Sequence, residues 1–270
     1  MKLKWPLGLG MSGLMLVLAG CAGSGGPAAS SGAAPRTDVV TESDQTDARR
    51  RARLRLALAT GYFEQGQTEV ALDELKQAIV IDPTFAEALN LRGLVYMRLN
   101  DLPLAEDSFR RALVLDPRDA DAAHNYGWLL CQQSRFAEST QQFERAVEIP
   151  GYTNAAKSLM AQGICQIRAG NRVPAEKSLV RSYELDAGNP VTGYNLASLM
   201  LETGQLARAQ FYVRRINNSP LANAETLWLG IKIERKLDNR EAMTQLGNEL
   251  RRGFAQSPQR RAYDRGAFDE

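Results

Sequence analysis

Apolar residues recur with helical spacing from about residue 51 onward. One apolar face is formed by Leu54, Leu58, Tyr62 and Phe63. After a break at Gly66, a second face is formed by Ala71, Leu75, Ala78 and Ile79. Positions separated by three or four residues lie on one side of a helix. The pattern therefore predicts two short amphipathic helices, with small residues that allow them to pack closely, ending at Asp82-Pro83.

The next stretch, from residue 82 to residue 112, shows the repeating unit most clearly. Its key positions are Asp82, Pro83, Leu89, Gly93, Tyr96, Ala105, Phe109 and Ala112. A second Asp-Pro pair, Asp116-Pro117, follows the first after 34 residues. Small and large residues at this spacing on two short helices, closed by an Asp-Pro turn, resemble the tetratricopeptide repeat.

Further copies follow along the chain, centred on the glycines or alanines Gly127, Gly163, Ala197 and Gly230. Gly127 precedes Gly163 by 36 residues rather than 34, which predicts a small insertion near Pro150-Gly151. The sixth copy is the weakest, as expected for a repeat that caps the stack. The sequence thus predicts an all-α fold, a right-handed superhelical solenoid of about six tetratricopeptide repeats over residues 51–256. Residues 257–270 are expected to form a frayed polar tail.

The first helix of each repeat should line a concave surface. Six residues are predicted to form a protein-binding groove there: Leu56, Phe63, Asn90, Leu94, Met97 and Trp128. The same face should continue through Met160, Ile164, Ile167, Tyr194 and Leu201. This stripe is more apolar than a solvated surface requires, and such surfaces mark sites for proteins or peptides. Phe63, Leu94 and Met97 are the strongest candidates for holding a helix or strand of a partner.

The first 20 residues have the composition of a secretory signal. Lys2 and Lys4 precede an uncharged apolar run, which is shorter than the roughly 20 residues that span a membrane. The residues Leu18-Ala19-Gly20-Cys21 resemble a bacterial lipobox, so Cys21 is expected to carry the lipid. An ordinary signal with an incidental cysteine is the alternative. Residues 21–50 then form the lipidated cysteine and a flexible tether, because they contain no periodic apolar residues.

Composition and charge exclude several classes of function. The net charge of +2 includes two lysines of the signal, so the remaining chain is about neutral and lacks the basic surface of a nucleic-acid-binding protein. Only one histidine, His124, is present, which excludes a zinc site built on several histidines. No phosphate loop or nucleophile elbow is recognisable. We therefore expect no enzyme, no cofactor, no metal and no small-molecule substrate, and a structural role for His124.

Two further cysteines, Cys131 and Cys165, lie 34 residues apart. Each falls near the middle of the first helix of its repeat, and these helices should lie side by side. A disulfide between them would persist in an oxidising compartment. Two buried free thiols are the alternative.

The combination of a lipobox, a tether and six repeats resembles the type IV pilus biogenesis lipoproteins of the PilF/PilW family. The most specific part is the run from Asn125 to Cys131, followed by Phe136-Ala137-Glu138-Ser139, Pro150-Gly151-Tyr152 and Gly163-Ile164-Cys165. The two cysteines are similar to those of beta-proteobacterial members. The sequence departs from the family pattern at Ser139 and Ser182, where alanine is usual.

This resemblance implies a pilotin, an outer-membrane lipoprotein that helps the type IV pilus secretin to localise and form multimers, and hence supports pilus biogenesis and twitching motility. It implies a position on the periplasmic face of the outer membrane, with the residue Ala22 after the cysteine favouring that sorting. The expected partners are the secretin and other pilus assembly proteins. The alternative is another outer-membrane repeat lipoprotein, an adaptor for envelope or cell-wall assembly.

Overall fold

The computed structural model describes residues 46–269, and these residues form helices joined by short turns, without a strand among them. The first six helices are α1 (Asp47–Glu64), α2 (Thr68–Ile81), α3 (Ala86–Arg98), α4 (Leu102–Leu115), α5 (Ala120–Gln132) and α6 (Phe136–Glu148). The next six are α7 (Ala155–Arg168), α8 (Arg172–Leu185), α9 (Pro190–Glu202), α10 (Leu206–Asn217), α11 (Ala224–Lys236) and α12 (Arg240–Gly253). The last is α13 (Pro258–Asp264). The expectation of an all-α fold is confirmed.

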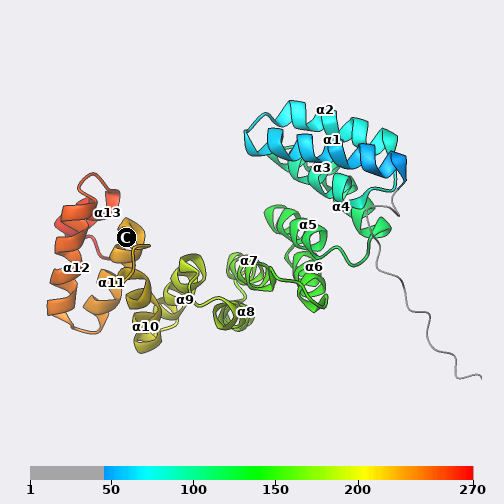
Figure 1. Ribbon diagram of the computed structural model, residues 1–270. Helices are drawn as coiled ribbons and strands as arrows, with labels where there is room; N and C mark the ends of the chain where they lie inside the picture. Colours follow the sequence, from blue (N-terminus) through cyan, green and yellow to red (C-terminus); the bar gives the residue numbers. More distant parts are fainter. Residues whose placement is uncertain (1–45, 270) are drawn as a thin grey trace, which may run out of the picture. The chain divides into compact units, whose positions relative to one another are not determined.

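Consecutive helices pack as pairs, and each pair packs on the next. The strongest contacts join α1 with α2, α3 with α4 and so on to α11 with α12. Weaker contacts join each second helix to the first helix of the next pair, and successive first helices to one another. Figure 1 shows these pairs following one another in chain order. Because each pair contacts only its neighbours, the fold is a tetratricopeptide-type solenoid, as the sequence predicts.

The turn inside each pair has one residue in the left-handed region. These residues are Gly66, Asn100, Ser134, Gly170, Gly204 and Asp238, with φ between 54° and 78°. Glycine, asparagine and aspartate adopt this conformation most readily. Their steps along the chain are 34 residues, except for 36 between Ser134 and Gly170. The turns therefore mark six repeats and one insertion, in agreement with the sequence.

The recurring glycines of the first helices are packing residues. A Cβ atom on Gly93 would lie 2.5 Å from Cε1 of Phe109, and one on Gly163 would lie 2.5 Å from Cγ of Leu179. Only hydrogen fits at these positions without a shift of the facing side chain. This confirms that the glycines serve the close approach of paired helices rather than the binding of a phosphate.

The insertion lies in the linker of residues 149–154, between α6 and α7. The corresponding linkers of the earlier repeats cover only residues 82–85 and 116–119. Gly151 has φ of 80°, and Tyr152 packs against the apolar cluster of the second and third repeats. The longer linker is thus anchored by an aromatic side chain instead of the usual Asp-Pro turn.

The carboxyl-terminal region differs from the frayed polar tail expected from sequence. Residues 258–264 form α13, which contacts both α11 and α12. Tyr263 and Phe268 pack on the last apolar cluster, and the Phe268 ring lies 5.6 Å from that of Trp228. These two aromatic residues, in an otherwise polar stretch, hold α13 against the last repeat by covering its open end. At the other end, Thr46 caps α1, which begins at Asp47, four residues before the predicted start of the domain.

Candidate functional site

The six residues predicted to form the groove lie on the first helices of the first three repeats. Leu56 and Phe63 are on α1, Trp128 is on α5, and the remaining three are on α3. All six are partly buried and partly accessible. A face that is neither core nor fully solvated has the exposure that a binding surface needs.

A pocket of about 330 Å³ lies among α3, α5 and α7. It is lined by Leu94, His124, Asn125, Trp128, Lys157, Met160, Ala161 and Ile164. Leu94, Trp128, Met160 and Ile164 are residues that the sequence analysis placed on the concave face, and the structure brings them together. This volume is at the lower end of the range for small-ligand pockets and suits one large apolar side chain.

The other predicted groove residues do not line this pocket. Phe63 is covered by Arg98, whose guanidinium carbon lies 3.6 Å from the ring centroid and whose Nη1 donates a hydrogen bond of 2.5 Å to the Phe63 carbonyl. Leu56 and Met97 pack against the apolar clusters of the first and second repeats. The pocket therefore lies mainly between the third and fourth repeats, and of Phe63, Leu94 and Met97 only Leu94 lines it.

Two amide side chains lie beside the pocket. Nδ2 of Asn125 donates a hydrogen bond of 2.9 Å to Oδ1 of Asn90. Each amide carries two donor hydrogens and a carbonyl oxygen with two acceptor positions, so the pair keeps unused capacity of both kinds. A donor and an acceptor beside an apolar pocket match the main chain of a peptide whose side chain enters the pocket. The sequence prediction includes Asn90 but not Asn125, although Asn125 follows Asn90 by 35 residues, one more than the repeat length.

His124 forms part of the pocket floor and is only 7% exposed. Its Nδ1 lies 2.8 Å from Oγ of Ser158, which in turn lies 3.2 Å from the hydroxyl of Tyr152. Burial, with a smaller effect of the nearby Lys157 charge, lowers the pKa of His124 to about 4. The imidazole is therefore neutral at physiological pH and partnered, which fits the structural role expected from the sequence.

The same hydrogen-bonded chain ties the inserted linker to the third repeat. The Tyr152 hydroxyl donates to Oδ1 of Asp121 over 3.3 Å. Burial is the main cause that raises the pKa of Tyr152 to about 12, and the Asp121 charge adds to it. Tyr152 thus stays a neutral donor, and it fixes the linker next to one wall of the pocket.

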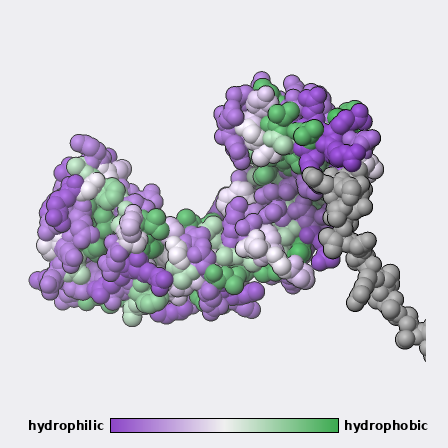
Figure 2. All heavy atoms as spheres, viewed as in Figure 1, coloured by the Kyte–Doolittle hydropathy of each residue, from purple (hydrophilic) through white to green (hydrophobic). Residues whose placement is uncertain are grey.

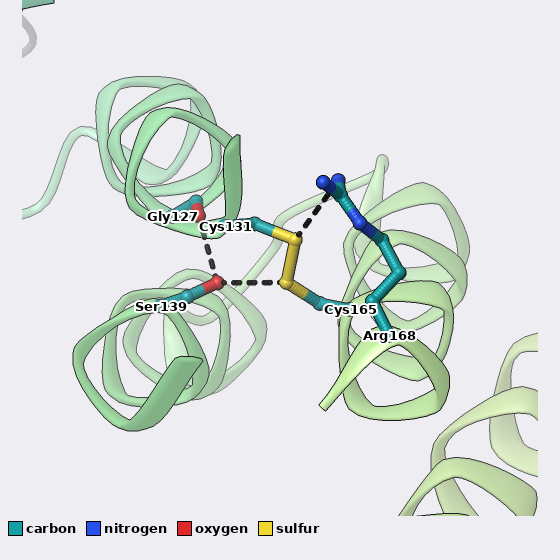
Figure 3. The surroundings of a disulfide bond; sticks show 5 residues. All are labelled: Gly127, Cys131, Ser139, Cys165 and Arg168. Atoms are coloured by element: carbon teal, nitrogen blue, oxygen red, sulfur yellow. Dashed lines mark hydrogen bonds between the residues drawn. A yellow bond between two sulfur atoms is a disulfide. The ribbon is translucent and has the colours of Figure 1, made fainter. Parts of the chain in front are cut away.

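Cys131 on α5 and Cys165 on α7 are joined by a disulfide bond in the structure, with their Cα atoms 5.9 Å apart. Figure 3 shows the bond connecting the two helices, with Arg168 on one side and Ser139 on the other. The sulfur atoms belong to the apolar cluster on which Trp128 packs. The disulfide therefore fixes the two helices that carry most of the pocket lining.

Ser139 and Ser182 both make hydrogen bonds between paired helices. Oγ of Ser139 donates to the Gly127 carbonyl over 2.7 Å, and Oγ of Ser182 donates to the Ala156 carbonyl over 2.8 Å. Both serines are completely buried. A buried hydroxyl is tolerated when it is hydrogen-bonded, so both serines fit the packed core.

Figure 2 shows hydrophobic residues, in green, among the hydrophilic ones over the middle helices of the chain. Within residues 46–269, no group of histidine, cysteine and acidic side chains has the arrangement of a metal site. None of the helices described is both long and apolar enough to cross a membrane. Cys21 and residues 22–45 of the predicted tether lie outside the described residues. What the described region offers is an apolar pocket with polar edges, suited to binding a protein segment.

Comparisons with known proteins agree with the repeat fold. Two family models match, one described as TPR repeat over residues 61–100 and one as tetratricopeptide repeat over residues 86–119. The chain is 27% identical to the type IV pilus assembly protein PilF of Pseudomonas aeruginosa over 224 residues, covering 80% of this chain and 88% of PilF. It is 24% identical to an uncharacterized protein of Haemophilus influenzae over 135 residues, covering 50% of this chain and 75% of that protein.

Solved structures give the same picture. The structure of Pseudomonas aeruginosa PilF matches with a TM-score of 0.73 at 24% identity, covering 82% of this chain and 100% of that one. The structure of PilW, described as a widely conserved type IV pilus biogenesis factor, matches with a TM-score of 0.70 at 29% identity, covering 78% of this chain and 97% of that one. The chain is a tetratricopeptide-repeat protein that is homologous to PilF and has the fold of PilF and PilW.

Proposed function

We propose that this chain is a non-catalytic scaffold of type IV pilus biogenesis that acts as a pilotin for the pilus secretin. The observation that carries the proposal is the homology to PilF, which extends over 80% of this chain and 88% of PilF. An alignment of 224 residues spans several repeats of a solenoid rather than one shared repeat. Tetratricopeptide repeats alone do not specify a partner, because the same fold serves many.

The pocket among α3, α5 and α7 supports a role in binding a protein segment. Its walls are mainly apolar, and Asn90 and Asn125 lie beside it with unused hydrogen-bonding capacity. We propose that a segment of the secretin places an apolar side chain between Leu94, Trp128 and Met160. Its main chain would then bind to the two amides, so that side-chain shape and backbone hydrogen bonds both contribute.

The lipid on Cys21 would give this scaffold its place at the periplasmic face of the outer membrane. The residues Leu18-Ala19-Gly20-Cys21 and the following Ala22 support this part of the proposal. A diacylglycerol with a further acyl chain anchors a protein stably, whereas one chain does not. The tether then lets the scaffold hold secretin subunits close to the membrane while they assemble.

The test is a gene deletion in the native bacterium, followed by complementation with the wild type or with Cys21→Ala. Without the protein, we expect secretin monomers or mislocalised secretin on gels of separated membranes, together with loss of surface pili and of twitching motility. The wild type should restore multimers in the outer membrane. The Cys21→Ala chain should be recovered as a soluble periplasmic protein.

Unchanged secretin multimers in the deletion strain would refute the pilotin role. If the anchored protein instead co-purified with envelope or cell-wall assembly proteins, the alternative adaptor function would replace it. Continued sorting of Cys21→Ala to the outer membrane would refute the lipid anchor while leaving the pilus role open to the first measurement.

A further inference from the structure

A second pocket, of about 270 Å³, lies at the linkers that join α8 to α9 and α10 to α11. It shares no residue with the pocket among α3, α5 and α7. Its walls include Tyr183, Asn189, Pro190, Tyr212, Arg215 and Leu221. None of these residues belongs to the groove predicted from sequence, so the pocket requires its own explanation.

Aromatic rings form one side of this pocket. The Tyr183 and Tyr212 rings have centroids 4.9 Å apart and are nearly perpendicular, at 86°. Phe211 extends the row, with its centroid 5.1 Å from that of Tyr212. Perpendicular rings are a stable aromatic arrangement and present flat faces and edges against which another apolar ring can pack.

Large apolar side chains are exposed around the aromatic row. Phe211 is 58% exposed, Leu221 is 51% exposed and Val191 is 46% exposed. Leu221 lines the pocket, and the other two neighbour the lining residues Tyr212 and Pro190 in sequence. Single exposed apolar residues are ordinary, but one in the wall of an aromatic pocket adds apolar surface that a bound segment can cover.

The hydroxyl of Tyr183 gives the pocket an unused hydrogen-bond donor. This oxygen atom is buried, and it has no hydrogen-bond partner among the residues that the structure describes. Leaving a buried polar group unpartnered is unfavourable, so the site gains when an acceptor arrives. The oxygen is inaccessible in the unbound chain, so the side chain must turn toward the pocket before a carbonyl oxygen of a bound segment supplies that acceptor.

Arg215 adds a positive charge at the same place. Its guanidinium carbon lies 5.9 Å from the Tyr183 ring centroid, and within residues 46–269 it has no carboxylate partner. The preceding Arg214, in contrast, is paired with the buried Glu234. An arginine without an acid beside an apolar pocket favours an acidic group on the ligand.

We propose that this second pocket binds a proline-rich segment of another protein that carries an acidic residue next to its prolines. Proline rings pack on aromatic faces, and the polyproline II helix leaves its carbonyl oxygens free to accept hydrogen bonds. Tyr183 supplies the donor, the rings of Tyr183 and Tyr212 supply the faces, and Arg215 binds the acid. The pocket does not depend on the pilus role, because it is separate from the first one.

The test measures binding of a fluorescein-labelled peptide of ten prolines followed by two glutamates to the mature chain with Cys21→Ala. A peptide of alternating glycine and serine with the same two glutamates serves as the comparison. We expect the proline peptide alone to bind, and Tyr183→Phe to weaken it about three- to tenfold, as for one hydrogen bond. The thermal unfolding temperature of Tyr183→Phe should stay unchanged or rise, because only an unpartnered hydroxyl is removed.

Charge variants test the role of Arg215. Arg215→Glu should weaken binding of the glutamate peptide about tenfold but leave a plain ten-proline peptide nearly unaffected. Arg118→Glu, which makes the same charge change at an exposed position elsewhere, should bind both peptides like the wild type. Equal binding of the glycine-serine peptide would overturn the proposal. It would also be overturned if Tyr183→Phe and Arg215→Glu bound normally, or if only Leu94→Glu in the first pocket abolished binding.

Discussion

His124 shows how its surroundings fix the role of one residue. It lies on the pocket floor, contacts Ser158, and has the exposed Lys157 and Asp121 nearby. Burial outweighs the attraction of Asp121 for a proton, so the imidazole stays neutral. A catalytic or pH-sensing histidine would need a pKa near neutrality. The residue therefore supports the pocket rather than acting in it.

The lowered pKa predicts a dependence of stability on pH. As pH falls from 7 to 4, the unfolded chain takes up a proton on His124 near pH 6.5 whereas the folded chain does not, so unfolding becomes easier. A pKa lowered from 6.5 to about 4 corresponds to about 3 kcal/mol, most of it lost by pH 4. Urea unfolding of the wild type and of His124→Gln should show their difference in unfolding free energy shrinking over this range.

The comparison with the variant isolates the histidine from the carboxylates. Arginine hydrogen bonds lower the pKa values of Asp82, Glu106 and Glu176 against the effect of burial. Their contribution is lost as pH falls through those lowered values, and it is present in both proteins, so it cancels in the difference. A difference in unfolding free energy that stays constant between pH 7 and pH 4 would contradict the buried, neutral histidine.

At the scale of elements, the third and fourth repeats are joined across the irregular linker by a covalent bond. Cys131 and Cys165 are 34 residues apart and connect α5 to α7. Gly151 and Tyr152 replace the Asp-Pro turn in that linker, and the disulfide joins α5 of the repeat before it to α7, which follows it. The sequence left a disulfide and two free thiols as alternatives, because spacing alone places the helices together but not the sulfur atoms.

We expect the disulfide to contribute to stability in the mature protein. Closing a loop of 34 residues should stabilise the fold by up to about 4 kcal/mol in the chain-entropy treatment. Reductant should therefore lower the unfolding temperature of a Cys21→Ala chain. The variant with Cys131→Ala and Cys165→Ala added should unfold at a lower temperature that no longer responds to reductant. Mass spectrometry after alkylation without reductant would refute the bond if both thiols were modified.

For the whole molecule, the repeat pattern was sufficient to predict the fold. The left-handed turns, the packing glycines and the longer linker after the third repeat each require particular residue types at particular spacings, so they can be recognised in the sequence. The pocket among α3, α5 and α7 is only partly predictable from the sequence. Leu94, Trp128, Met160 and Ile164 follow from helical positions, but Asn125 and the cover of Arg98 over Phe63 depend on how neighbouring side chains turn. The second pocket and α13 were missed because aromatic side chains from separate elements form them only after folding.

The pocket among α3, α5 and α7 leads to a prediction about partner binding. Leu94→Glu places a carboxylate against Trp128 and Met160, and burying it under a bound apolar segment is unfavourable. We expect it to weaken binding of the purified periplasmic part of the secretin more than tenfold while circular dichroism keeps its helical signal. Val114→Glu makes a matched change on α4, where the side chain is 79% exposed outside the pocket, and should bind normally.

Phe63→Glu should affect stability more than binding, because Phe63 packs under Arg98. If Phe63→Glu weakened binding as much as Leu94→Glu without lowering the unfolding temperature, the partner site would extend to the first repeat. Loss of helical signal in Leu94→Glu would instead make Leu94 a core residue.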